Sequence, residues 1–147
     1  SRITTIYEGT SQLQVVAAEK GVVSGVFATW VEPHEAKQYE DPDLAAMRDR
    51  LIEARGQIGD AIQFAKSKGG AYMELSGRKL VDSAIAVMIG HLFLGQAEKS
   101  ERKKAVAHRF LRRELPVVRM NCEIVGDGDT SPFEQYSLLA GPVPAAD

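Results

Sequence analysis

The stretch DPDLAAMRDRLIEARGQIGDAIQFAKSKGG, residues 41–70, decides the fold of this 147-residue chain. Asp41 can accept hydrogen bonds from the free N–H groups of a first helical turn, and Pro42 suits that turn. Apolar residues then recur every three or four positions in a single stripe, and Gly69-Gly70 stops the pattern. The stripe consists of Leu44, Met47, Leu51, Ala54, Ile58, Ile62 and Ala65. It predicts a helix that ends at residues 66–68 and packs on a core through one face.

A second helical pattern precedes this stretch. Residues 10–30 predict a helix that Thr10 or Ser11 can cap, because a hydroxyl satisfies the free N–H groups of the first turn. Gly21 and Gly25 weaken its second half by about 1 kcal/mol each relative to Ala. Residues 31–40 contain Pro33 and are predicted to be a linker.

Two more helices are predicted after Gly69-Gly70. Residues 71–99 form the central one, because residues 84–94 are apolar nearly all round. Ser100 begins the next, which Pro116 should kink and Gly126 should close. Residues 127–147 contain Gly, Pro and Ser and are predicted to be an extended, partly disordered tail. No strand pair is predicted, so we expect an all-α, up-and-down four-helix bundle-like fold.

The composition excludes several functional classes. The 18 basic and 20 acidic residues give a net charge of -2, which disfavours a generic nucleic-acid binder. The longest apolar run, residues 84–90, is far shorter than the ~20 residues of a membrane span. A single cysteine, Cys122, allows no internal disulfide, and the first residues lack the apolar run of a signal peptide. A reducing, cytoplasmic location is therefore expected.

A short motif near the start carries a resemblance. Residues 6–14 read IYEGTSQLQ, preceded by Arg2-Ile3. This segment resembles the tyrosine-glutamate-glycine-threonine signature of the acyl-CoA dehydrogenases, which are flavoproteins. Residues 72–77 (YMELSG) and 109–116 (RFLRRELP) resemble the extra C-terminal helical region of longer family members. The second resemblance spans most of residues 41–126, with looser motifs.

The resemblance implies roles for five residues. Glu8 matches the catalytic base that removes a proton from the carbon next to the thioester carbonyl, and burial beside an acyl chain would raise its pKa. Gly9 matches a backbone position close to the acyl-CoA substrate. Thr10, Ser11 and Gln12 match positions that contact FAD, and a helix start suits a phosphate. The family's N-terminal helical domain and middle β-domain do not occur in these 147 residues, so the chain alone should hold no FAD.

The resemblance also implies a division of the chain. Residues 1–30 would be the end of the catalytic bundle, residues 31–40 a linker, residues 41–126 a C-terminal helical extension and residues 127–147 the tail. The expected function is the C-terminal part of an FAD-dependent acyl-CoA dehydrogenase, with acyl-CoA and an electron acceptor as partners of the whole enzyme. The alternative is a non-catalytic helical module for subunit or membrane-surface contacts.

Other polar residues favour plain structural roles. His34, His91 and His108 lie on separate segments, so no metal site is predicted, and His91 is expected to be a satisfied core or interface residue. Cys122 is expected to be a small buried hydrophobe. The cations of residues 99–119 form either a solvated face or a surface for anionic lipid or the phosphates of CoA, of which the solvated face is favoured.

A homo-oligomer is also expected. The predicted helix over residues 10–30 needs a partner for its apolar residues, which are Leu13, Val16, Val23, Val26 and Phe27. It can fold back on residues 41–126 or pair with a second copy of the chain. Pairing is favoured, because residues 31–40 offer a hinge and exchange of an element is a low-cost route to a dimer.

Overall fold

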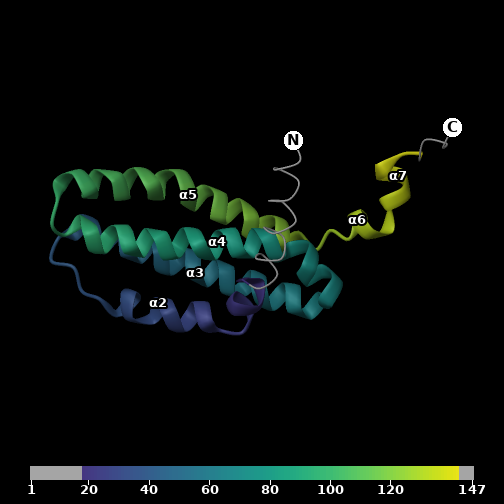
Figure 1. Cartoon of the computed structure of the whole chain (residues 1–147), viewed down its shortest axis with the longest axis horizontal. Helices are drawn as coiled ribbons and strands as arrows, with labels where there is room; N and C mark the ends of the chain where they lie inside the picture. The colour runs from purple at the N-terminus through teal and green to yellow at the C-terminus, as the bar shows by residue number, and fades with distance from the viewer. Residues whose placement is uncertain (1–17, 143–147) are drawn as a thin grey trace, which may run out of the picture.

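The computed structural model describes residues 18–142, and all of its regular structure there is helical. Three long helices, α3 (Pro42–Lys68), α4 (Gly70–Ala97) and α5 (Glu101–Asp127), run alternately up and down and pack pairwise against one another (Figure 1). The shorter α2 (Val26–Ala36) packs against α3 and α4. The predicted all-α, bundle-like fold is therefore confirmed.

The predicted ends of the long helices are also confirmed to within two residues. The Asp41 carboxylate accepts from the Asp43 N–H at 2.9 Å, and Pro42 occupies the first turn of α3. A single residue, Gly69 with φ 99°, connects α3 to α4, and this left-handed backbone region strongly favours glycine. Ser100 caps the start of α5, and Gly128 with φ 74° is its C-cap, slightly beyond the predicted Gly126. Pro116 lies inside α5 without ending it.

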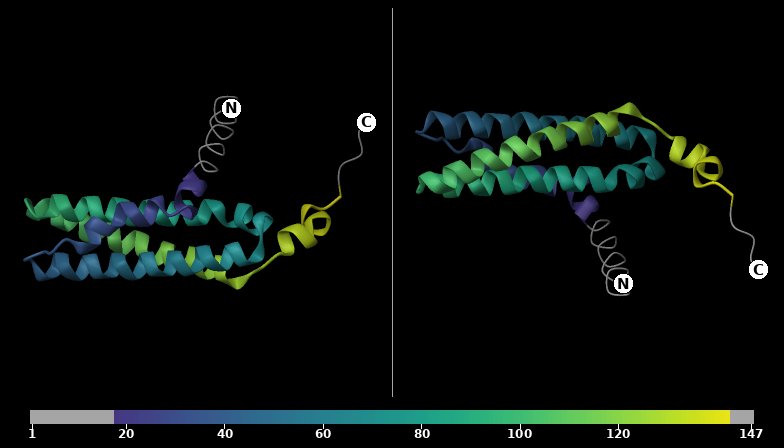
Figure 2. Two further views of the ribbon diagram at one scale, coloured as in Figure 1. Left: turned by 90° about the horizontal axis from the view of Figure 1, so that it is seen from below. Right: turned by 90° about the horizontal axis from the view of Figure 1, so that it is seen from above.

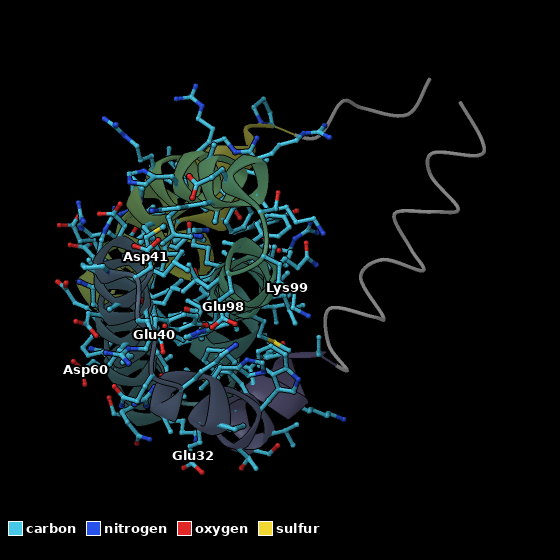
Figure 3. All side chains as sticks on the ribbon, turned by 90° about the vertical axis from the view of Figure 1, so that its left-hand side faces the viewer. Glu32, Glu40, Asp41, Asp60, Glu98 and Lys99 are labelled. Atoms are coloured by element: carbon cyan, nitrogen blue, oxygen red, sulfur yellow. The ribbon has the colours of Figure 1, made fainter. Side chains whose placement is uncertain are left out.

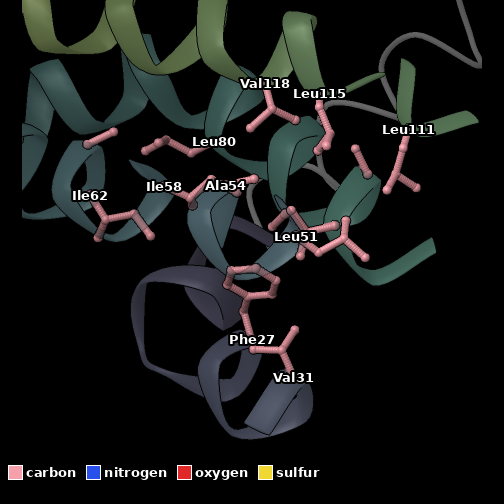
Figure 4. Close-up of a cluster of buried hydrophobic side chains, with 14 of the residues drawn as sticks. Phe27, Val31, Leu51, Ala54, Ile58, Ile62, Leu80, Leu111, Leu115 and Val118 are labelled. Atoms are coloured by element: carbon pink, nitrogen blue, oxygen red, sulfur yellow. The ribbon is translucent and has the colours of Figure 1, made fainter. Parts of the chain in front are cut away.

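The core lies between α3, α4 and α5 and is closed on one side by α2 (Figure 4). Leu51 and Ile58 of α3 meet Leu80 of α4 and Leu111 of α5, and each is at most 1% exposed. The Tyr72 hydroxyl donates to the backbone carbonyl of Val125, which joins the far ends of α4 and α5. Each fully buried aliphatic side chain contributes about 1.5–3 kcal/mol, so the three long helices stabilise one another.

The predicted linker over residues 31–40 is wrong for Val31–Ala36, which belong to α2. Pro33 lacks the N–H for one helical hydrogen bond, at a cost of about 3 kcal/mol. Burial of Phe27 and Val31 against the bundle offsets this cost, at about 1.5–3 kcal/mol each. The predicted continuous helix to Trp30 is wrong as well, because a turn at Ser24-Gly25 separates helical residues 18–23 from α2.

The structure also corrects the reason given for pairing through residues 10–30. Phe27 is buried and Val23 is half-buried against the chain's own core, so these residues already have a partner. Val26 is exposed, and Leu13 and Val16 lie outside the described residues. The fold-back alternative therefore describes residues 22–31, and a homo-oligomer needs other support.

The predicted extended tail is wrong for residues 131–140. Two short helices, α6 (Ser131–Glu134) and α7 (Tyr136–Ala140), form there. The Asp129 carboxylate accepts from the N–H of Ser131, and Pro132 lies in the first turn of α6. Both short helices lie beyond the end of the bundle, as the views from below and above show (Figure 2). We call residues 128–142 the arm.

Candidate functional site

The five residues to which the resemblance assigns roles lie outside the described residues. Glu8, Gly9, Thr10, Ser11 and Gln12 all fall within residues 1–17. Their roles, including contact with FAD, therefore rest on the resemblance alone.

The most unusual polar residue is His91, which lies on α4 beneath α2. Its side chain is 1% exposed, and among residues 18–142 neither ring nitrogen has a hydrogen-bond partner. The ring of His34 on α2 lies 5.7 Å from that of His91 and stacks on Trp30 at 4.3 Å. The prediction of a core or interface histidine is right about burial and wrong about satisfaction.

The surroundings of His91 fix its charge. Burial, followed by the positive charge that His34 can carry, lowers the pKa of His91 from 6.5 to about 4. The imidazole is therefore neutral near pH 7. Among the described residues no group of three or more His, Cys, Asp or Glu side chains could hold a metal ion. His34 and His91 pack α2 against α4, and protonation of His91 would oppose this packing.

A second polar region lies at the end of the bundle where α2 joins α3 and α4 joins α5. The Lys104 ammonium lies 2.7 Å from the Asp41 carboxylate and 3.0 Å from that of Asp43, while Lys37 pairs with Glu98 at 3.1 Å. Glu40, Asp41, Glu98 and Lys99 lie at this end of the bundle and line one cavity (Figure 3). The hydrogen bond from Lys104 lowers the pKa of Asp41 and raises that of the lysine.

This polar end is a set of paired charges around an open cavity of about 700 Å³. A neighbouring groove of about 530 Å³ contains Lys104, His108, Arg109 and Arg112, but also Asp43 and Glu101. Because acids lie among the cations, this side of α5 favours the solvated-face interpretation over a phosphate or lipid site.

Cys122 lies in a shallow cavity of about 530 Å³ between α3 and α5. Its side chain is half-buried, so the prediction of a small buried hydrophobe is right only in part. Burial, followed by the charge of Asp60, raises the pKa of the thiol to about 11. The thiolate is the nucleophilic form of cysteine, so Cys122 is poorly suited to catalysis at neutral pH.

An exposed apolar surface covers the side of α4 that faces away from α2 and α3, together with the neighbouring side of α5. We call it the outer face. Its most exposed members are between 43% and 49% accessible, and they are Ile85, Leu92, Val106, Val117, Met120 and Ile124. The half-buried residues Met88, Ile89, Phe93 and Phe110 lie among them.

The two helices join this surface into one patch. Phe93 of α4 and Phe110 of α5 meet edge to face, with ring centroids 5.0 Å apart. Farther along, the Asn121 amide donates to the Ser83 hydroxyl at 3.3 Å. This antiparallel register places Ile85 level with Val117, so the apolar residues of α4 continue onto α5. A contiguous exposed apolar patch usually marks a contact site.

The outer face also explains why α4 is long and apolar enough to cross a membrane by composition. In its most apolar window, 56% of the residues are buried inside the bundle. This burial is expected for the central helix of a bundle. In the sequence the outer face corresponds to the apolar residues that surround α4 on nearly all sides. That pattern predicts only that this helix is central in the bundle.

Comparisons with known proteins found no family model, no curated protein and no solved structure that matches this chain.

Proposed function

We propose that this chain is the C-terminal part of an FAD-dependent acyl-CoA dehydrogenase, in which the helical bundle acts as a non-catalytic contact module. The first half of this proposal is supported by the resemblance of residues 6–14 to the family signature. The second half is supported by one structural observation, the outer face on α4 and α5. The two halves are compatible, because an extension can mediate contacts within an enzyme.

The chemistry proposed for Glu8 is that of a general base. Its carboxylate would take a proton from the carbon next to the thioester carbonyl of acyl-CoA, and a hydride would leave the neighbouring carbon. FAD, when bound, supplies the acceptor for that hydride. Gly9 would let the substrate approach the backbone, while Thr10, Ser11 and Gln12 would contact the cofactor.

The enzyme half is tested in the intact parent protein. Glu8→Gln keeps the shape of the side chain and removes the base, so turnover should fall by roughly 10²–10⁴ with unchanged flavin content. Glu32→Gln, on the exposed side of α2, is the matched control and should leave turnover unchanged. Turnover of the Glu8 variant within about twofold of the parent would show that the base lies elsewhere.

The contact half is tested by making the outer face polar. Leu92→Ser with Val117→Ser removes two exposed apolar side chains, so the fold should survive while assembly of the protein weakens. Val26→Ser is the matched control, since Val26 is exposed on α2, away from the outer face. Unchanged assembly in the double variant, measured by analytical ultracentrifugation, would refute the contact role.

A further inference from the structure

The arm has an apolar surface that the bundle does not cover. Phe133, Tyr136, Leu138 and Leu139 are between 47% and 79% exposed, and neither α6 nor α7 has a buried residue. Helices of four and five residues are too short to be stable in water by themselves. The arm therefore needs a surface on which to pack.

The charge of the arm limits what it can pack on. Residues 128–142 contain the acids Asp129 and Glu134 and no Lys or Arg. An acidic, apolar segment such as the arm is complementary to a surface that is apolar and bordered by cations. A bare anionic lipid surface would repel it.

The outer face has this complementary character. Along α5 the exposed Arg102 and Arg113 stand among the apolar Val106, Phe110 and Val117, and successive members of this set are three or four residues apart. These residues share one side of the helix because such steps return to the same face. Arg113 has a side chain that is 72% exposed, and within the described part of the chain it pairs with its neighbour Glu114 alone.

The arm of the same chain does not reach this surface in the structure. α6 and α7 lie beyond the end of α5 and point away from the bundle (Figures 1 and 2). Residues 128–130 connect α5 to α6, and the left-handed Gly128 at their start turns the chain away from the bundle. An arm that projects past its own bundle is placed to meet another molecule.

We propose that the outer face binds the arm of a second copy of this chain, and that two copies exchange arms. Leu138 and Leu139 pack on the outer face of the partner copy, which includes Leu92 and Val117, and Glu134 approaches its arginines. Each copy offers one arm and one face, so reciprocal exchange between two copies gives a closed dimer with two-fold symmetry. This inference rests on the contact role proposed above and names its partner.

The test compares three variants of the 147-residue chain by sedimentation at several concentrations. The wild-type chain should be dimeric. Leu138→Ser with Leu139→Ser in the arm, and Leu92→Ser with Val117→Ser in the outer face, should each weaken dimerisation at least about a hundredfold. Val26→Ser should dimerise like the wild type. Circular dichroism checks that every variant keeps its helices, since all five positions are exposed.

A second measurement identifies the contact directly. Cys122→Ser with Leu139→Cys in one sample, and Cys122→Ser with Val117→Cys in another, should form a mixed disulfide faster on mixing than either forms with itself. A monomeric wild-type chain, or equal rates for all three disulfides, would overturn the arm exchange. If the outer-face variant dissociates while the arm variant stays dimeric, the contact role stands and the arm is the wrong occupant. If neither variant dissociates, both proposals fail.

Discussion

Acidification should destabilise this fold through His91, well above the pH at which carboxylates titrate. The folded chain holds the pKa of His91 at about 4, whereas an unfolded histidine titrates near 6.5. Between these values the unfolded chain binds more protons than the folded one. The contribution of neutral His91 to the free energy of unfolding is therefore fully present above pH 6.5 and is lost as the pH falls toward 4.

The magnitude follows from this pKa difference. At 1.36 kcal/mol per pKa unit, the complete loss is about 3 kcal/mol, of which about 2 kcal/mol falls between pH 7 and pH 5. That is a large part of the about 5–15 kcal/mol typical of a small domain. The loss should be measurable as a drop in the urea midpoint, followed by circular dichroism at several pH values.

Two variants separate His91 from other titrating groups. His91→Leu replaces a buried ring without hydrogen-bond partners by an apolar side chain, so it should abolish this pH dependence without loss of stability at pH 7. His108→Gln, at an exposed position on α5, should keep the wild-type dependence. If the wild type and the His91 variant lose the same free energy of unfolding between pH 7 and pH 5, the reasoning is wrong.

Two further predictions follow from the packing of α3. A Cβ at Gly90 would lie 2.7 Å from a methyl carbon of Leu51, so Gly90→Ala should lower the free energy of unfolding by about 1–3 kcal/mol. Gly59 has open space around it, so Gly59→Ala should raise the free energy of unfolding by up to about 1 kcal/mol. Thermal unfolding of both variants checks this, and equal effects would contradict it. The pKa of Cys122 is raised to about 11, so its thiol should react with iodoacetamide far more slowly than a free thiol at pH 7.5. Asp60→Asn removes a charge that raises this pKa and should speed the reaction. Alkylation as fast as that of free cysteine would show that the thiol is not shielded.

The local signals that predicted the long helices are strong because each has a direct physical cause. Asp41 caps α3 by accepting a hydrogen bond from the Asp43 N–H in the first turn, and Gly69 ends the helix with a backbone conformation that other residues avoid. The helical path of residues 31–36 could not be predicted this way. There the tertiary burial of Phe27 and Val31 outweighs the local cost of Pro33, and tertiary burial is not visible in a local pattern.

The candidate sites differ in the same way. The burial of His91 could be predicted from its place on an apolar helix, but its lack of partners depends on which side chains of α2 lie above it. The outer face required knowledge of which side of α4 is left uncovered. The roles of Glu8 to Gln12 came from a motif, and they stay predictions.

The single-residue junction at Gly69 has a consequence for how the chain folds. A connection this short costs little loop-closure entropy, so α3 and α4 should come together early, and the short link from Ala97 to Glu101 should bring α5 in soon after. Among the described residues, α2 buries only Phe27 and Val31 completely and should dock last. In the native protein α2 should open on its own, so its amides should exchange with deuterium well before those of the three long helices.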